Sequence, residues 1–369
     1  MYKLKDFAQD ISVAIKDAQS SPFDRFVGLE HYDSGEPVIT RYTDKSLLSS
    51  SVKEFRKNDI LIARRNVYLK RAGIAFFDGL TSGDSIVLRI YDDCESRTGI
   101  SKQDAIRIIP FILNSNVFWA YANKHADGMN SKRISKEMLY DYEFDLPPLA
   151  EQKVLAEKLW AAYRLKESYK KLLAATEEMV KSQFIEMFGC SAERVALSSL
   201  CDTFIDGDWI EAKDQSDTGI RLIQTGNVGV DTFKDKGDKA RYISEETFNR
   251  LNCTEVVEGD ILISRLPDPV GRACIIPAGL GKSITAVDCT IIRLNDKVLP
   301  KFFVAFTNTP DYAMQIKKVL SGTTRLRVSR ANLGKIQVPL PSIDKQQQFV
   351  TIAKQADKSG YGYGFKLAS

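Results

Sequence analysis

The chain has 369 residues, of which 44% are hydrophobic and 27% charged, and its formal net charge at neutral pH is +4. This length is more than one hydrophobic core usually serves, so we expect two globular domains, and the composition excludes a disordered or fibrous chain. The first residues contain no apolar run long enough for a signal peptide or a membrane span, which predicts a cytoplasmic protein with no membrane partner.

Charge is balanced within each half of the chain. Residues 1–149 carry 21 Lys and Arg against 21 Asp and Glu, and residues 191–341 carry 20 against 19. A nucleic-acid partner would therefore have to be bound through local basic clusters and not through the overall charge.

Cysteine and histidine are too sparse and too scattered to predict a metal site or histidine catalysis. No two cysteines form a CxxC pair, and the only histidines are His31 and His125. This usage indicates free, buried thiols in a reducing compartment. The cysteines are Cys94, Cys190, Cys201, Cys253, Cys274 and Cys289.

The first 150 residues read as short strands followed by a helix. The segments "FVGLEHYDSGE" at 26–36, "NDILIARR" at 58–65 and "IVLRI" at 86–90 are rich in β-branched residues and bounded by turn residues, which predicts strands. A helix is expected around Pro110 to Ala122, with the proline in its first turn. We therefore expect an α+β domain at residues 1–149.

Much of this pattern recurs later in the chain. The segment "SKRISKEMLYDYEFDLPPLAEQ" at 131–152 aligns without a gap, at an offset of 194, with "RLRVSRANLGKIQVPLPSIDKQ" at 325–346. Upstream, "GDILISRL" at 259–266 repeats "NDILIARR", and "TIIRL" at 290–294 repeats "IVLRI". Because the repeat extends from strands to helix, with the second helix expected at Pro300 to Lys318, we predict a second α+β domain at residues 190–342.

A different kind of segment separates the two copies. From Glu151 to Phe188 there is no Gly or Pro, and apolar residues recur every three or four positions, which predicts a spacer helix of about 57 Å within residues 150–189. The alternative is two shorter helices that fold back within a domain. The apolar stripe is expected to pack on a partner. The stripe residues expected to bind partners are Leu155, Leu159, Tyr169, Leu173, Val180 and Met187.

A second helix begins at Ile343. It is expected to end near Lys358, where the glycines of "SGYGYGFKLAS" at 359–369 break the pattern and indicate a flexible tail. The second spacer helix is therefore predicted to be much shorter than the first.

No catalytic signature is complete. The "GLGKS" at 279–283 lacks the upstream glycine of a phosphate-binding loop and has no clear helix after it. The "DLPPL" at 145–149 lacks the stacking aromatic that adenine methyltransferases place beside the flipped base. We therefore predict a chain that is not an enzyme and holds no metal.

Basic clusters recur at equivalent points of the two copies. Arginine can bind guanine edges and phosphate, so these clusters are candidate DNA-binding sites, and the competing interpretation is a solvated face with ordinary ion pairs. The first copy contributes Arg64, Arg65, Lys70, Arg71, Lys132, Arg133 and Lys136. The second contributes Arg265, Arg272, Arg325, Arg327 and Arg330.

Together, these residues resemble the specificity subunit of type I restriction-modification systems. The similarity rests on the paired "LPPLAEQ" and "LPSIDKQQ" signatures that lead into helices, the "NDILIARRNVYLKRAGIAFFDG" stretch at 58–79, and the order domain, helix, domain, helix. It implies an α+β fold with two target recognition domains separated by long helices that pack antiparallel like a coiled coil, here with the second helix truncated.

The resemblance also implies function and partners. Each domain would read one half of a bipartite site in double-stranded DNA, and two methyltransferase subunits would dock on the helices and adjoining surfaces. The complex would recruit restriction subunits. S-adenosylmethionine, ATP and magnesium would belong to those partners, leaving this chain without a cofactor.

The short second helix departs from the family. It would leave part of the central helix uncovered, which suggests a shortened specificity subunit that self-associates or needs a second chain to assemble. A rival from another class is a noncatalytic scaffold that binds only protein.

Overall fold

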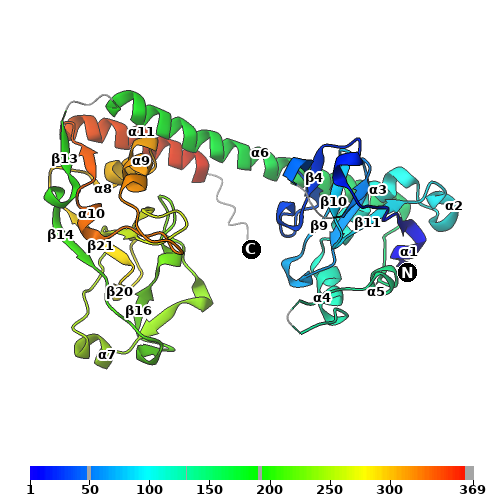
Figure 1. Cartoon of the computed structure of the whole chain (residues 1–369), viewed down its shortest axis with the longest axis horizontal. Helices are drawn as coiled ribbons and strands as arrows, with labels where there is room; N and C mark the ends of the chain where they lie inside the picture. The colour runs from blue at the N-terminus through cyan, green and yellow to red at the C-terminus, as the bar shows by residue number, and fades with distance from the viewer. Residues whose placement is uncertain (48–50, 130, 190–192, 362–369) are drawn as a thin grey trace. The chain divides into compact units, whose positions relative to one another are not determined.

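The computed structural model describes residues 1–47, 51–129, 131–189 and 193–361 of the chain. It divides into two compact units, Met1–Glu167 and Ser168–Ser369. The boundary falls inside the long helix α6 (Leu149–Phe188), so each unit includes part of that helix (Figure 1). The prediction of an α+β fold with two repeated domains and a long intervening helix is confirmed.

The first unit contains two five-stranded sheets and a small two-stranded one. One sheet has the order β2 (Ala8–Asp10), β11 (Ser85–Ile90), β8 (Ile60–Ala63), β9 (Ala72–Ala75), β5 (Val38–Ile39). The other has the order β3 (Ala14–Ile15), β7 (Val52–Phe55), β10 (Gly79–Ser82), β4 (Arg25–Val27), β6 (Thr43–Asp44). Strands β1 (Tyr2–Lys3) and β12 (Glu143–Phe144) pair with each other, so the two ends of the domain meet.

The second unit repeats this plan with fewer strands. One sheet has the order β14 (Cys201–Asp206), β21 (Cys289–Leu294), β18 (Ile261–Ser264), β19 (Ala273–Ile275). The other has the order β15 (Gln215–Ser216), β17 (Arg241–Ile243), β16 (Ile220–Ile223), β20 (Ser283–Thr285). Strands β13 (Arg194–Ala196) and β22 (Gln337–Pro339) close the domain as β1 and β12 do.

The pairing of the strands confirms the internal repeat. The run β2, β11, β8, β9 corresponds to β14, β21, β18, β19, and all its neighbours are antiparallel. In the other sheet of each unit the equivalent pairs β4 with β10 and β16 with β20 are both parallel. Two segments with little sequence identity therefore adopt one topology.

The predicted strand "NDILIARR" is buried on both faces. Side chains alternate along a strand. Ile60 and Ile62 therefore enter the core beneath the helices, whereas Leu61 and Ala63 enter the core between the two sheets. In the second unit Ile261 and Ile263 face the helical core in the same way. A continuous apolar run is what a strand covered on both sides requires.

An internal ion pair fixes the start of this strand in both units. Asp59 accepts two hydrogen bonds from Arg89, at 2.8 and 2.7 Å, and Asp260 accepts two from Arg293, both at 2.8 Å. Both carboxylates are almost fully buried, so each needs its arginine to offset the loss of water. The pair joins β8 to β11 and β18 to β21.

The helix expected around Pro110 to Ala122 is wrong in its bounds. The structure has α3 (Lys102–Ile112), which contains Pro110, and then α4 (Asn116–Lys124). The break occurs because the Ser115 hydroxyl accepts a hydrogen bond from the Phe118 amide and starts a new helix.

The other helices surround this core. The single helix expected at Pro300 to Lys318 of the second unit is also divided into two helices. These are α8 (Pro300–Thr307) and α9 (Pro310–Lys318), and each begins with proline. Shorter helices are α1 (Leu4–Phe7), α2 (Cys94–Thr98), α5 (Lys136–Tyr140), α7 (Glu245–Arg250) and α10 (Arg330–Leu333).

The long helix α6 is continuous, which excludes two shorter helices that fold back. Within the second unit its end packs beside α11 (Ile343–Tyr361), where Phe184 and Phe188 contact Phe349 (Figure 1). Helix α11 extends three residues past the expected end, and the rest of the predicted tail, 362–369, lies outside the described residues.

The repeated glutamine after each Leu-Pro pair positions the start of each spacer helix. The side chain of Gln152 donates to the Pro147 carbonyl at 2.7 Å, and Gln346 donates to the Pro341 carbonyl at 2.9 Å. Both glutamines are buried. The Leu-Pro and glutamine signature therefore fixes the first turn of the helix that follows each domain.

Candidate nucleic-acid interface

In the first unit, the β8–β9 loop (residues 64–71) lies against a basic hairpin whose two sides are residues 127–129 and 131–133. The Asn66 amide donates to the Lys132 carbonyl at 2.7 Å, and the Ile134 amide donates to the Arg64 carbonyl at 3.0 Å. Two basic segments that are about 60 residues apart in sequence therefore form one surface. The hairpin itself closes through hydrogen bonds between Asp127 and Arg133, of 2.9 and 2.8 Å.

Three arginines of this surface converge on one carboxylate. Asp84 lies 3.8 Å from Arg64 Nε, 3.7 Å from Arg65 Nη1 and 3.5 Å from Arg133 Nη2. Arg65 also donates from Nε to the Ser131 hydroxyl at 2.7 Å. The carboxylate neutralises only one of the three positive charges, so the group keeps a net positive charge. Its contacts also fix the positions of the three guanidinium groups relative to one another.

The lysines predicted for DNA binding occupy different positions. Lys132 is exposed. Lys70 donates to the Asn116 side chain at 3.1 Å. Lys136 forms an ion pair with Asp10, whose side chain is nearly buried, and this contact ties α5 to β2. Lys136 therefore also stabilises the domain.

The last arginine of each loop acts as a clamp. Arg71 donates to the carbonyls of Leu29, at 3.0 Å, and Arg65, at 2.9 Å. In the second unit, Arg272 donates to the carbonyls of Val228, at 2.6 Å, and Leu266, at 2.9 Å. Shifts of 199 and 201 residues relate these acceptors, so the contacts are equivalent.

Two further bonds complete the clamp of Arg272, which also donates to the carbonyls of Pro269 and Thr225. Burial lowers the pKa of both clamp guanidinium groups, Arg71 and Arg272. Both Nη atoms of Arg71, and the Nε and both Nη atoms of Arg272, donate to backbone carbonyls. Sequence comparison recognised both arginines but could not assign this role, since the acceptors lie on a distant loop.

The second unit builds the same surface from the β18–β19 loop (265–272) and a hairpin of residues 321–327. Ser321 and Arg327 exchange two hydrogen bonds of 2.9 Å, and the Val328 amide donates to the Arg265 carbonyl at 3.2 Å. Gly322 has a φ of +103° and Gly128 of the first hairpin has +112°, so both turns use the backbone freedom of glycine at the same place.

The charges on this second surface are arranged differently. Arg265 is largely buried, donates to the Val287 carbonyl at 2.6 Å and lies 3.4 Å from Asp206. Arg325, Arg327 and Arg330 are exposed, and no ion-pair partner for them occurs among residues 1–47, 51–129, 131–189 and 193–361. The hairpin of the second unit therefore presents three uncompensated arginines.

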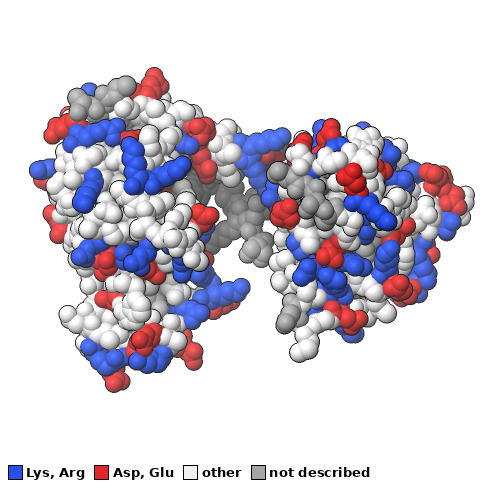
Figure 2. All heavy atoms as spheres, in the orientation of Figure 1, with Lys and Arg blue, Asp and Glu red and all other residues white. Residues whose placement is uncertain are grey.

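No broad basic face is seen in the view of Figure 2. Lysine and arginine alternate with aspartate and glutamate over the visible surface of each unit, as the balanced composition predicts. Any polyanion would have to be bound by local groups such as the two hairpins.

The predicted partner-binding stripe of α6 separates into two groups. Leu155, Tyr169 and Leu173 are 40%, 39% and 46% exposed, and Leu159 is partly exposed. Val180 and Met187 pack against the core of the second unit. Only the first group is available to a partner without disturbing a domain.

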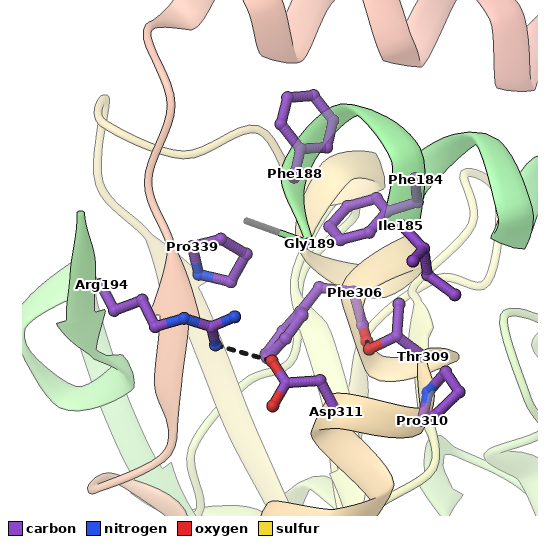
Figure 3. Close-up of a pocket in the computed structure, with 10 residues that line it drawn as sticks. All are labelled: Phe184, Ile185, Phe188, Gly189, Arg194, Phe306, Thr309, Pro310, Asp311 and Pro339. Atoms are coloured by element: carbon purple, nitrogen blue, oxygen red, sulfur yellow. Dashed lines mark hydrogen bonds and ion pairs between the residues drawn. The ribbon is translucent and has the colours of Figure 1, made fainter. Parts of the chain in front are cut away.

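A shallow apolar pocket lies at the end of α6, lined by Phe184, Phe188 and Phe306 (Figure 3). An ion pair between Arg194 and Asp311, at 2.6 Å, closes its rim. Its lining contains no nucleophile beside a base, so it offers no catalytic arrangement.

Metal and nucleotide chemistry find no support in the described part of the chain. No group of three or more His, Cys, Asp or Glu residues there could hold a metal ion. Burial raises the pKa of the partly buried Cys201 thiol and of the buried Cys274 thiol to about 12, which suits unreactive cysteines. Cys190 lies outside the described residues. The "GLGKS" segment leads into strand β20, not a helix.

No helix in the described residues is long and apolar enough to cross a membrane.

Comparison with known proteins finds a family profile that matches the second unit. The family profile described as "Type I restriction modification DNA specificity domain" matches residues 192–360. The matched residues coincide with most of the second unit, which is therefore similar to the DNA specificity domains of this family. The chain is 23% identical over 265 residues to the type I restriction enzyme EcoBI specificity subunit of Escherichia coli, covering 63% of this chain and 55% of that protein.

A solved structure of a type I specificity subunit agrees with the fold. The S subunit from M. genitalium aligns over 98% of this chain and 90% of its own, with 13% identity and a TM-score of 0.51. The HsdS subunit from Thermoanaerobacter tengcongensis aligns over 98% and 89%, with 16% identity and a TM-score of 0.39. The chain spans about half the length of the curated relative it matches.

Proposed function

We propose that this chain is the DNA-recognition subunit of a type I restriction-modification complex, in which each unit reads one half of a bipartite site. The observation that carries the proposal is the repeated surface of loop and hairpin, which presents arginines at equivalent positions in both domains. Arginine can neutralise phosphate and bind guanine edges, so the surface suits duplex DNA.

The two surfaces are alike in backbone and different in side chains. The first holds Arg64, Arg65 and Arg133 around Asp84, whereas the second leaves Arg325, Arg327 and Arg330 uncompensated. A shared frame with different side chains would let two domains bind DNA in related orientations and prefer different sequences. Joining two modest half-sites would raise affinity through effective concentration.

Partners would supply the chemistry. The exposed stripe of α6, including Leu155 and Leu173, is offered to two methyltransferase subunits, and restriction subunits would join through that complex. S-adenosylmethionine, ATP and magnesium would be held by those partners. The chain itself would determine which DNA sequence the complex binds. We expect the complex to act in the cytoplasm.

Salt dependence of DNA binding tests the proposal. A complex that contacts several phosphates should lose affinity by at least ten-fold between about 50 and 200 mM salt. Replacing Arg325, Arg327 and Arg330 by alanine should reduce this salt dependence by about three counterions. A chain that bound its protein partners but no duplex at any salt concentration would instead be a protein scaffold.

A second possibility for assembly follows from the short α11, which runs beside only the end of α6. The uncovered stripe would then be shared with a second copy of this chain or another specificity polypeptide. Coexpression with the methyltransferase subunit alone, followed by mass measurement, decides the matter. One copy of the chain with two methyltransferase subunits and full activity would rule out the need for a second specificity chain.

A further inference from the structure

The β8–β9 loop of the first unit presents an aromatic and an aliphatic side chain outward from a basic surface. Tyr68 is 58% exposed and Leu69 is 38% exposed, although both side chains are large and mostly apolar. Within the described chain, the Tyr68 hydroxyl has no hydrogen-bond partner. The pair is flanked in sequence by Arg65 and Lys70.

The loop that carries this pair is fixed at several points. Val67, the neighbour of Tyr68, is fully buried in the helical core. Asn66 and Lys70 both have left-handed φ angles, of 55° and 50°, and the clamp of Arg71 closes the loop behind them. A side chain on such a rigid loop is held in one position, and recognition of DNA bases requires this.

The surroundings favour nucleic acid over protein as the occupant. The Asn66 amide bonds the Lys132 carbonyl, so the loop lies directly against the hairpin that carries Lys132 and Arg133. Protein interfaces are depleted of charge around their apolar centre, and two isolated apolar side chains among cations do not match that pattern. A tyrosine ring and a leucine can instead contact a thymine methyl group or a base face while the cations bind phosphate.

The equivalent loop of the second unit has the same clamp and a different tip. Arg272 closes it as Arg71 does, but its tip contains Pro267, Asp268 and Pro269 in place of an aromatic, and Asp268 is exposed. An exposed carboxylate would repel phosphate. The second unit must therefore rely on its hairpin arginines where the first can use its loop.

We propose that Tyr68 and Leu69 contact bases of the half-site read by the first unit, and that Arg71 is the positioning residue that holds them there. This rests on the proposed function in DNA recognition and names the residues that give one half of it its sequence preference. The DNA would be bound as intact duplex, with the loop tip in a groove and the flanking cations on the backbone.

Selection from a duplex library with randomised sequence, using the chain assembled with its methyltransferase subunits, tests this proposal. Tyr68→Ala should weaken preference at one or two positions of one half-site by about 5- to 100-fold, the range for losing one base contact, and leave the other half unchanged. Tyr68→Phe, which retains the ring, should keep most of the preference. Tyr42→Ala, at another exposed tyrosine of the same unit, is the matched control and should change nothing.

Arg71→Lys separates positioning from charge. Lysine keeps the positive charge but cannot hold the carbonyls of both Leu29 and Arg65 in the same fork, so the salt dependence should stay and the preference at the same positions should fall. Selection profiles for Tyr68→Ala that match the unsubstituted protein would overturn the assignment. Failure of the unsubstituted complex to select any sequence would overturn the proposed function instead.

Discussion

Arg133 and Asp84 lie 3.5 Å apart, and this ion pair joins the basic hairpin of the first unit to the strand connection before β11. Because Arg64 and Arg65 approach the same carboxylate, Asp84 sets both the positions and the net charge of three arginines. The equivalent residue in the second unit, Asp288, has no ion pair within the described residues, although its carbonyl accepts the Arg265 amide as Asp84 accepts that of Arg64.

Asp84→Asn should tighten non-specific DNA binding and loosen discrimination. Removing one negative charge frees an arginine for phosphate, so the slope of log affinity against log salt should steepen by about one. At the same time the three arginines lose the carboxylate that fixes their positions, so the sequence preference in one half-site should weaken. Fluorescence anisotropy with random-sequence duplex at several salt concentrations measures the slope.

Asp288→Asn is the matched control, since it removes the same charge at a carboxylate that forms no ion pair within the described residues. It should leave the slope within error of the unsubstituted protein. Equal effects of the two substitutions would mean that Asp84 acts only through overall charge.

The ion pair between the buried Asp59 carboxylate and Arg89 should matter for stability. Asp59→Ala leaves the arginine without its partner and the Arg56 amide without its acceptor, so the free energy of unfolding of the first unit should fall by about 2 to 4 kcal/mol. Denaturant unfolding followed by circular dichroism measures this. Asp92→Ala removes an exposed carboxylate that pairs with Lys102, and a comparable loss there would contradict the distinction between buried and exposed pairs.

Acid stability should depend on Lys136. Burial alone would raise the pKa of Asp10, but hydrogen bonds from Lys136 and Ser12 outweigh it and lower the pKa below its usual value. A carboxyl whose pKa is lowered on folding stabilises the fold above its unfolded pKa of about 4, and this contribution is lost as the pH falls through the folded pKa.

Lys136→Ala should therefore raise the pKa of Asp10 and move the acid-unfolding midpoint of the first unit to higher pH. Circular dichroism between about pH 2 and 6 records the midpoint. Lys132→Ala removes the same charge from an exposed side chain and serves as control. An unchanged midpoint for Lys136→Ala would show that the ion pair with Asp10 contributes nothing to the fold.

Two positions on α6 should separate partner binding from folding. Leu173→Asp changes an exposed side chain, so unfolding should be unaffected while copurification of the methyltransferase subunit falls by at least ten-fold, about 1.4 kcal/mol of binding. Val180→Asp places a charge against the core of the second unit and should lower its stability. Retained copurification with Leu173→Asp would remove the middle of α6 from the docking surface.

Much of the fold could be predicted because the repeat is written in local patterns. The run at Ile60–Ala63 is apolar without interruption, and the segment from Glu151 to Phe188 contains no helix breaker, so each indicated its element directly. The bounds of α3 and α4 could not be predicted, since the break depends on the Ser115 cap, which competes with an apolar stretch on either side.

The candidate site was only partly predictable. Spacing identified the arginines of both copies, and the structure brings Arg65 and Arg133 together across a single β-bridge. Sequence could not distinguish Arg71, which clamps backbone, from Arg65, which is exposed, because the difference lies in carbonyls on other loops. Asp84 was missed for the same reason. An acidic residue gives no sign in sequence that three distant cations will meet it.

The central claim is that each unit reads its own half of a bipartite DNA site, and mapping methylated adenines tests it most directly. DNA exposed to the assembled complex should carry methyl groups only within a two-part sequence interrupted by an unread spacer. With Arg327→Ala and Arg330→Ala together, methylation should spread to sites altered in one half while the other half stays fixed. Equal relaxation of both halves, or methylation with no two-part pattern, would contradict the claim.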